Sequence, residues 1–249
     1  MKFLEYVMAG LGVGVVFGMF GAGGSAFATP VLAVLGVPGL LAVASPLPAM
    51  IPAAFVSARR YLKSGNLDRC VAKLAVIGGI PGTLIGALAS RLVGGDRLLV
   101  LSGLLLLGIG ARLLLPDRVG AAGRAADRRS STPVVVGSAF GVGLLTGLLA
   151  NGGGFLLVPL FVLVLGMTTI EAAGTSMVVV GILTVPTFAM HWALGHIDWT
   201  VAAGFAVGLI PASLVGARLA QHVPADRSRL AFGAMLVGFS VWFLIRQLT

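Results

Sequence analysis

Charged side chains are scarce in this sequence. Only 10% of the 249 residues are Asp, Glu, Lys or Arg, whereas soluble globular domains carry about 25%, so a soluble domain is excluded. Hydrophobic residues make up 58% of the chain, and apolar runs of about 20 residues, long enough to cross about 30 Å of hydrocarbon as helices, recur along it. A membrane β-barrel would instead have short alternating segments. The sequence therefore predicts an all-α membrane protein surrounded by a lipid bilayer.

Cysteine and histidine are also rare. The single cysteine, Cys70, excludes an internal disulfide or thiolate cluster, and the three histidines have no metal-ligand spacing. We therefore expect no metal and no other cofactor. No paired acids mark a catalytic centre, and no Gly-Lys-Ser/Thr loop marks a nucleotide site. The sequence predicts neither an enzyme nor an ATP-driven pump.

Glycine, in contrast, is abundant, with 37 residues. Glycine disfavours soluble helices but lets membrane helices approach closely through contacts between small residues four positions apart. The residues with this spacing, which we expect on packed helix faces, are Gly10, Gly14, Gly18, Gly78, Gly82, Gly86, Gly204 and Gly208.

The chain is one unit written twice. The glycine-rich stretch 18–30 returns at 147–159 with an offset of 129, and the matching continues at an offset of 130, which pairs Asp68 with Asp198. We therefore divide the chain into an N-terminal repeat at 1–115, a basic linker at 116–132 and a C-terminal repeat at 133–249.

Each repeat is expected to contain five helical segments. They are placed at 3–20, 24–37, 39–59, 70–93 and 97–115, and at 133–150, 154–167, 170–192, 199–220 and 228–248. The second segment of each repeat spans only about 21 Å as a helix, and Pro30 and Pro159 interrupt it by removing a backbone donor. Short, broken segments at matching positions of two halves point to the binding site of a transporter. The first two segments of each repeat either cross the membrane or form a re-entrant hairpin.

The basic residues predict that the two repeats are inverted. The loop between the third and fourth segments is basic in the first half, whereas the corresponding stretch 191–200 has no Lys or Arg. Equivalent loops should therefore face opposite sides. Because basic loops stay in the cytoplasm, we expect a multi-pass protein of the cytoplasmic membrane with a cytoplasmic linker and both termini outside. The net charge of +9 should then meet anionic lipid rather than nucleic acid.

The two glycine-rich turns form the predicted substrate site. Irregular backbone at membrane depth is tolerated only where it packs in protein or lines a watery cavity, so the turns should meet near the midplane. Glycine leaves no Cβ between a ligand and the backbone amides, and the helix after each turn begins with N–H groups that favour an anion. The predicted contacts are Gly21, Gly23, Gly24, Ser25, Thr29, Ser45, Asn151, Gly152, Gly153, Gly154, Thr175 and Ser176.

Three acids lie near the predicted site or its loops. Glu171 has two open roles: proton coupling, or stabilisation of a helix N-terminus by its carboxylate. For Asp68 and Asp198, which lie in matched loops, the expected role is helix capping. His191 and His196 flank the predicted exterior loop and are expected at the surface.

Several motifs resemble the TauE/SafE family of sulfite and organosulfonate exporters. They are the glycine-rich turn followed by Pro30-Val-Leu, with Pro159-Leu-Phe as the weaker copy, the Ala-Gly-Thr-Ser run at 173–176 and the Gly-x-Ile-Asp at 195–198. The resemblance covers nearly the whole chain. It implies movement of sulfite, sulfonates or related small organic anions across the cytoplasmic membrane. The first repeat departs from the second, with Ala-Ser-Pro at 44–46 where the second has Gly-Thr-Ser, so the halves of the site are not chemically equivalent.

The sequence thus predicts a secondary transporter, an exporter of small anions that works by alternating access. An anion channel and, with less support, a membrane sulfur-handling enzyme or partner are the alternatives. A small anionic substrate and the lipid bilayer are the expected partners, and a homodimer is left open.

Overall fold

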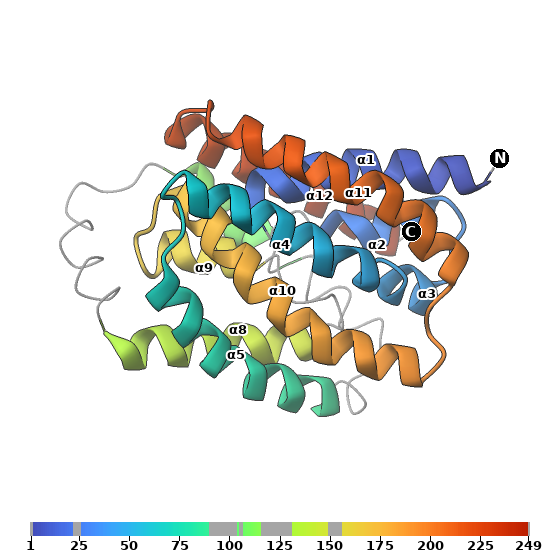
Figure 1. The fold of residues 1–249 in the computed structure, drawn as a ribbon, viewed down its shortest axis with the longest axis horizontal. Coiled ribbons are helices and arrows are strands. Elements are labelled where there is room, and N and C mark those ends of the chain that lie inside the picture. Colours follow the sequence, from blue (N-terminus) through green and yellow to red (C-terminus); the bar gives the residue numbers. More distant parts are fainter. Residues whose placement is uncertain are drawn as a thin grey trace.

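Every regular element among the described residues of the computed structural model is a helix, which confirms the all-α prediction. The described residues are 2–21, 26–89, 104, 107–115, 131–148 and 156–248. The helices, drawn in Figure 1, are α1 (Lys2–Phe20), α2 (Ala28–Val34), α3 (Gly39–Ala44), α4 (Leu47–Lys63), α5 (Arg69–Ala89), α8 (Thr132–Leu148), α9 (Leu157–Leu163), α10 (Thr169–Ala193), α11 (Trp199–Ala220) and α12 (Ala225–Leu248).

Six helical stretches within these residues are long and apolar enough to cross a membrane. They are Lys2–Phe20, Leu41–Lys63, Arg69–Gly86, Thr169–Ala193, Trp199–Ala220 and Asp226–Ile245. The prediction of a helical membrane protein is confirmed.

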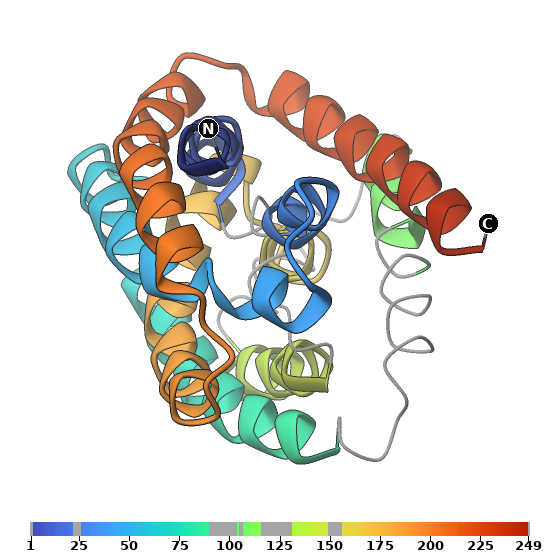
Figure 2. The same cartoon turned by 90° about the vertical axis from the view of Figure 1, so that its right-hand side faces the viewer.

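The long helices surround two short ones. Figure 2, which looks along the long axis, shows α11, α4, α10 and α5 as an outer wall, with α1 and α8 inside it and α2 and α9 near the centre. The buried apolar residues form two clusters, one mainly from α1, α2, α4 and α11 and the other mainly from α5, α8, α9 and α12. Helix α10 contributes to both.

The most extensive helix contacts join one repeat to the other. Helix α1 packs along α11, and α5 packs along α8. Glycine makes both approaches possible, because a Cβ on Gly10 or Gly208 of the first pair, or on Gly78 or Gly82 of the second, would overlap backbone atoms of the facing helix. These four positions bear out the expectation of glycine-packed faces. Matched helices of the two repeats are thus paired crosswise, and the inversion of the repeats stays a prediction.

The ends of the helices separate the basic loops from the neutral one. In Figure 1 the N and C termini lie at the same end of the molecule, together with the loop between α10 and α11. The loop between α4 and α5 and the loop between α11 and α12 lie at the other end, which we call the basic end because Arg59, Arg69, Arg218 and Arg227 are near it. The linker lies outside the described residues except for Ser131 and Thr132, the second of which begins α8.

Three predicted segments differ from the observed helices. The helix expected at 39–59 is divided at Ser45–Pro46 and continues to Lys63, because Pro46 lacks an N–H to continue the ladder although both residues keep helical dihedrals. Helices α2 and α9 have seven residues each, fewer than expected at 24–37 and 154–167. Pro30 and Pro159 therefore do not interrupt a helix, since each is the third residue of its helix, where the N–H has no intrahelical partner.

Candidate functional site

Two of the predicted site hydroxyls hold the loops of the opposite repeat. Ser45 Oγ accepts a hydrogen bond of 3.0 Å from the backbone N–H of Asp198, and Thr175 Oγ1 accepts one of 3.0 Å from the backbone N–H of Asp68. Both hydroxyls are buried. Because the Asp68 loop is at the basic end and the Asp198 loop is at the other end, the structure separates Ser45 from Thr175. It does not bring these two together at one depth.

The capping role expected for both aspartates is confirmed. Asp198 Oδ1 accepts hydrogen bonds from the backbone N–H groups of Thr200 at 2.8 Å and Val201 at 3.2 Å. Asp68 Oδ1 accepts them from Cys70 and Val71, both at 3.0 Å. These carboxylates satisfy the first donors of α11 and α5, which have no intrahelical acceptors.

The first glycine turn begins against α10. Gly21 has a φ of +70°, and a Cβ there would lie 2.6 Å from Ala173 Cα and 2.6 Å from Ser176 Oγ. Only glycine fits this backbone and this space. Ser176 Oγ donates a 2.9 Å hydrogen bond to the carbonyl of Ala173. Of the predicted contacts, Gly21 and Ser176 are therefore brought together. They meet in the first third of α10, on the side of the helix midpoint that faces the basic end.

A residue that the sequence analysis missed secures this turn. The Tyr61 hydroxyl of α4 lies 2.7 Å from the carbonyl oxygen of Gly18 and 3.1 Å from that of Met19, and it donates to both. These carbonyls lie in the last turn of α1, whose end leaves them without the donors that a continuing helix would supply. Tyr61 is fully buried. Sequence reasoning had no signal for this role, because Tyr61 follows Arg59 and Arg60 and lies beyond the end of the helix predicted at 39–59.

Gly174 and Ser57 complete the surroundings of Tyr61. A Cβ on Gly174 would lie 2.7 Å from Tyr61 Cβ and would overlap the carbonyl oxygen of Asn66, so glycine lets α10 lie against α4 here. Ser57, one turn before Tyr61 on the same face of α4, is fully buried, and its Oγ has no hydrogen-bond partner in the described part of the chain. We call Gly21, Ser57, Tyr61, Gly174 and Ser176 the inner junction.

The matching positions of the second repeat carry different chemistry. His191 stands where the first repeat has Tyr61, and His196 stands where it has Asn66. The Nδ1 atoms of the two histidines are 3.3 Å apart, and both side chains are partly buried rather than fully at the surface. Pro46 occupies the position of Ser176. The two repeats therefore differ in chemistry at these matched positions.

Helices α2 and α9 begin directly after the glycine-rich stretches without side-chain caps. Their N-cap residues are Phe27 and Leu156, which make no capping hydrogen bond. Thr29, another predicted contact, lies in the first turn of α2 and is partly buried. The remaining predicted contacts lie outside the described residues; they are Gly23, Gly24, Ser25, Asn151, Gly152, Gly153 and Gly154.

Glu171 forms a capping box at the start of α10. The Glu171 backbone N–H donates to Thr168 Oγ1 at 3.3 Å, and the Thr168 backbone N–H donates to Glu171 Oε2 at 3.1 Å. This reciprocal pair satisfies two donors at the helix start. Helix-start stabilisation, one of the two roles considered for Glu171, is therefore observed. Proton coupling has no structural counterpart so far and stays a prediction.

The comparisons with known proteins identify the family. The family model for the sulfite exporter TauE/SafE matches residues 6–243. The chain belongs to the TauE/SafE family. A protein of Xylella fastidiosa strain 9a5c described as a probable membrane transporter protein is 30% identical over 246 residues, covering 94% of this chain and 92% of its own length. The probable membrane transporter protein YunE of Bacillus subtilis strain 168 is 27% identical, covering 90% of this chain and 89% of its own. No solved structure matches the chain.

TauE/SafE membership agrees with the resemblance drawn from the sequence motifs. Together with the relatives named as membrane transporters and the membrane-length helices, it makes this protein a multi-pass membrane transporter.

Proposed function

We propose that this transporter exports a small anion, such as sulfite or an organosulfonate, across the cytoplasmic membrane by alternating access. The observation that carries the proposal is the match of the sulfite exporter model to residues 6–243, nearly the whole chain. The proposed activity is transport rather than catalysis.

The chemistry around the inner junction is compatible with an anionic ligand. Its polar side chains, Ser57, Tyr61 and Ser176, are neutral, so the junction places no charged side chain in lipid. Ser57 has a buried hydroxyl with no described partner, and α2 begins without a side-chain cap close to the same turn. We propose that Gly23, Gly24 and Ser25 and their counterparts Asn151, Gly152, Gly153 and Gly154 contact the substrate together with these groups.

The arrangement of the two repeats supports alternating access. Matched helices pack crosswise between the repeats, so that a shift of one pair against the other changes which end is open. We place the basic end in the cytoplasm, following the positive-inside rule. The membrane potential then drives an anion outward with about 2.3 kcal/mol per charge per 100 mV, which suits an exporter.

Counterflow in proteoliposomes tests the proposed function. Vesicles preloaded with unlabelled sulfite should accumulate labelled sulfite through the purified protein, with saturation and competition by organosulfonates. For a uniported monovalent anion, a potential of 100 mV should sustain roughly a fiftyfold gradient. Empty vesicles and vesicles loaded with a carboxylate of the same charge are the controls. Rapid flux without counterflow would instead identify an anion channel.

The Glu171→Gln variant tests proton coupling against capping. If the carboxylate acts only in the capping box, Glu171→Gln and Thr168→Ala should each lower the free energy of unfolding by about 1 kcal/mol and leave the pH profile of transport unchanged. Transport rates are measured between pH 5 and 8, alongside thermal unfolding. A pH profile that flattens in Glu171→Gln but not in Thr168→Ala would assign the coupling proton to Glu171.

A further inference from the structure

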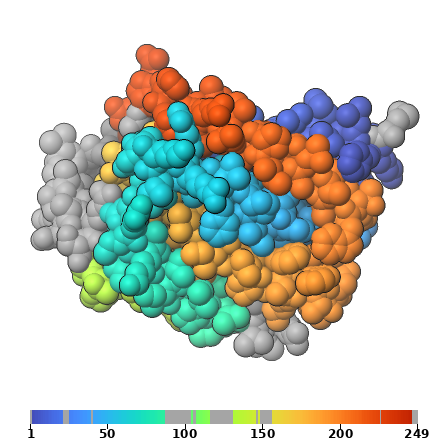
Figure 3. All heavy atoms as spheres, viewed as in Figure 1, coloured from blue at the N-terminus to red at the C-terminus, as the bar shows by residue number. Residues whose placement is uncertain are grey.

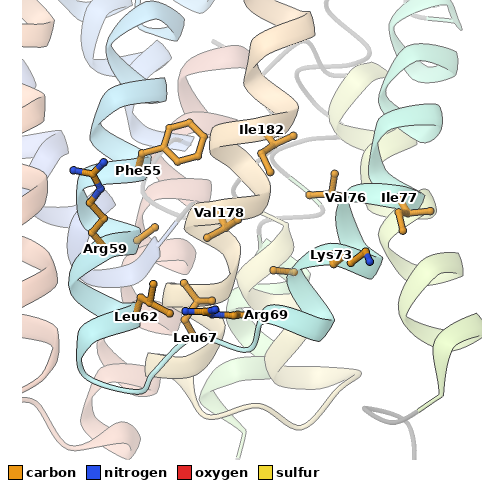
Figure 4. Close-up of a pocket in the computed structure, with 12 residues that line it drawn as sticks. Phe55, Arg59, Leu62, Leu67, Arg69, Lys73, Val76, Ile77, Val178 and Ile182 are labelled. Atoms are coloured by element: carbon orange, nitrogen blue, oxygen red, sulfur yellow. The ribbon is translucent and has the colours of Figure 1, made fainter.

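A groove opens between α4, α5 and α10 on the outer wall near the basic end. It encloses about 550 Å³, within the range of about 300–1,000 Å³ typical of ligand sites. Its walls are apolar, and Figure 4 shows Phe55 of α4 extending toward Ile182 of α10, with Val76 and Ile77 of α5 on the far side. In Figure 3, α10 lies between α4 and α5 on this face. We call it the basic groove.

Three cationic side chains line this groove: Arg59 on α4, and Arg69 and Lys73 at the start of α5. All three are exposed. Within the described part of the chain, none of them makes an ion pair or a side-chain hydrogen bond. No acid is among the described residues that line the groove, so its lining carries positive charge alone and can attract an external anion.

The walls of the basic groove face lipid. Phe55 is 39% exposed, Leu62 41% and Ile77 53%, although all three are apolar. These side chains belong to helices that are long and apolar enough to cross a membrane, where acyl chains rather than water would cover them. Cations near the end of a spanning helix extend toward the headgroup layer while their stems lie along apolar surface.

The repeat itself provides a comparison for these charges. At the matching positions of the second repeat, Ala189 replaces Arg59, Trp199 replaces Arg69 and Ala203 replaces Lys73. The fold accommodates both versions of this helix pair, so the three cations are not required for packing. Trp199 lies edge-on to Trp192, with ring centroids 6.4 Å apart, an aromatic arrangement typical of a membrane interface.

A second apolar groove has the opposite charge. It encloses about 640 Å³ between α1, α2 and α12, and Glu5 is its only charged lining residue among those described. The two grooves are similar in size and apolar character, and they differ in the charge at the mouth. If lipid only filled apolar gaps, both grooves would bind it alike, whereas attraction by charge would favour an anionic lipid at the basic groove alone.

We propose that the basic groove is a binding site for an anionic phospholipid of the leaflet at the basic end. One acyl chain lies between Phe55, Ile77 and Ile182, and the phosphate is held by Arg59, Arg69 and Lys73. Basic pockets between membrane helices bind phospholipid headgroups in this way, because each cation near the surface attracts the anionic lipid. The site is separate from the inner junction and does not depend on the identity of the transported anion.

Native mass spectrometry of the purified protein tests the site. Phosphatidylglycerol and phosphatidylcholine with the same acyl chains are titrated in parallel, and the bound lipid is counted per protein. The combined Arg59→Gln, Arg69→Gln and Lys73→Gln variant should bind phosphatidylglycerol roughly a hundredfold more weakly. The matched control removes three exposed charges at the same end but outside the groove, through Lys63→Gln, Arg218→Gln and Arg227→Gln, and should bind as the parent does.

Further measurements distinguish binding through the lipid headgroup from binding through the acyl chain alone and from binding of a transported anion. A variant with Arg59→Lys and Arg69→Lys should keep most of the binding, which shows that charge rather than loss of folding explains the glutamine variant. Equal loss in the control variant, or equal binding of phosphatidylcholine, would overturn the proposal. Displacement of the lipid by inorganic phosphate or by an alkyl sulfonate at equal concentration would also overturn it, in favour of a simple anion site or a substrate site.

Discussion

A leucine in place of Gly14 should leave no folded protein, whereas a leucine in place of Gly12 should be tolerated. Both residues lie on α1, two positions apart. A Cβ on Gly14 would lie 2.7 Å from the Leu209 carbonyl oxygen and 2.7 Å from Ala212 Cβ, but a Cβ on Gly12 would have nothing within 4 Å. Because backbone of α11 cannot yield without separating the helices, we expect Gly14→Leu to cost about 3 kcal/mol or more.

The second repeat offers the same experiment at matched positions. A Cβ added to Gly143 would lie 2.5 Å from the carbonyl oxygen of Gly79, whereas a Cβ added to Gly141 would have nothing within 4 Å. All four leucine variants are expressed as fusions, and the monodisperse fraction and thermal unfolding are measured. Gly14→Leu and Gly143→Leu should give no monodisperse fraction after extraction in detergent. Gly12→Leu and Gly141→Leu should give the same monodisperse fraction and the same unfolding temperature as the parent. Similar behaviour of all four would mean that the crosswise helix packing is wrong.

Removing the Tyr61 hydroxyl should slow transport about tenfold while the protein still folds. Tyr61→Phe keeps the ring in place but leaves the Gly18 and Met19 carbonyls without their donor. An unsatisfied buried acceptor costs about 1–3 kcal/mol, and that cost falls on the last turn of α1, directly before Gly21. The first glycine turn should therefore lose its defined position, and substrate affinity should fall with it.

The chain has two tyrosines, and the other is the matched control. Tyr6 on α1 is 8% exposed, and its hydroxyl makes no hydrogen bond to a described residue. Tyr6→Phe should leave transport and unfolding unchanged. Concentration dependence of counterflow and thermal stability are measured for both variants. If Tyr61→Phe transports at the parental rate with parental affinity, the hydroxyl does not position the turn.

Sequence reasoning identified the features of the fold that repeat along the chain. The apolar segments and the glycine faces follow from composition and spacing alone, and α11 was predicted with the observed bounds, Trp199–Ala220. The division of α3 from α4 at Pro46 was missed because a proline in an apolar run need not end a helix, as Pro52 within α4 and Pro81 within α5 show. Short helices such as α2 are the least predictable, since their limits depend on tertiary packing rather than on local propensity.

The candidate site was predicted less completely. Matching of the repeats correctly gave the capping roles of Asp68 and Asp198, because a capping residue and its helix are neighbours in sequence. The contacts between Tyr61 and Gly18 and between Gly21 and Ser176 join residues far apart in the chain. Nothing in the spacing of one sequence encodes such a pairing. Ser45 and Thr175 were grouped by residue type, but the structure gives each a separate backbone partner.

The crosswise packing of α1 on α11 and of α5 on α8 has a consequence for biosynthesis. When the ribosome has delivered the first repeat to the membrane, α1 and α5 still lack the helices that cover their glycine stripes. The surface of α5 is covered once α8, the first helix of the second repeat, has been inserted, but that of α1 is covered only when α11, in the last third of the polypeptide, follows. Neither repeat is therefore an autonomous module, and a chain truncated after the first repeat should be a substrate for membrane proteolysis rather than half of a working protein.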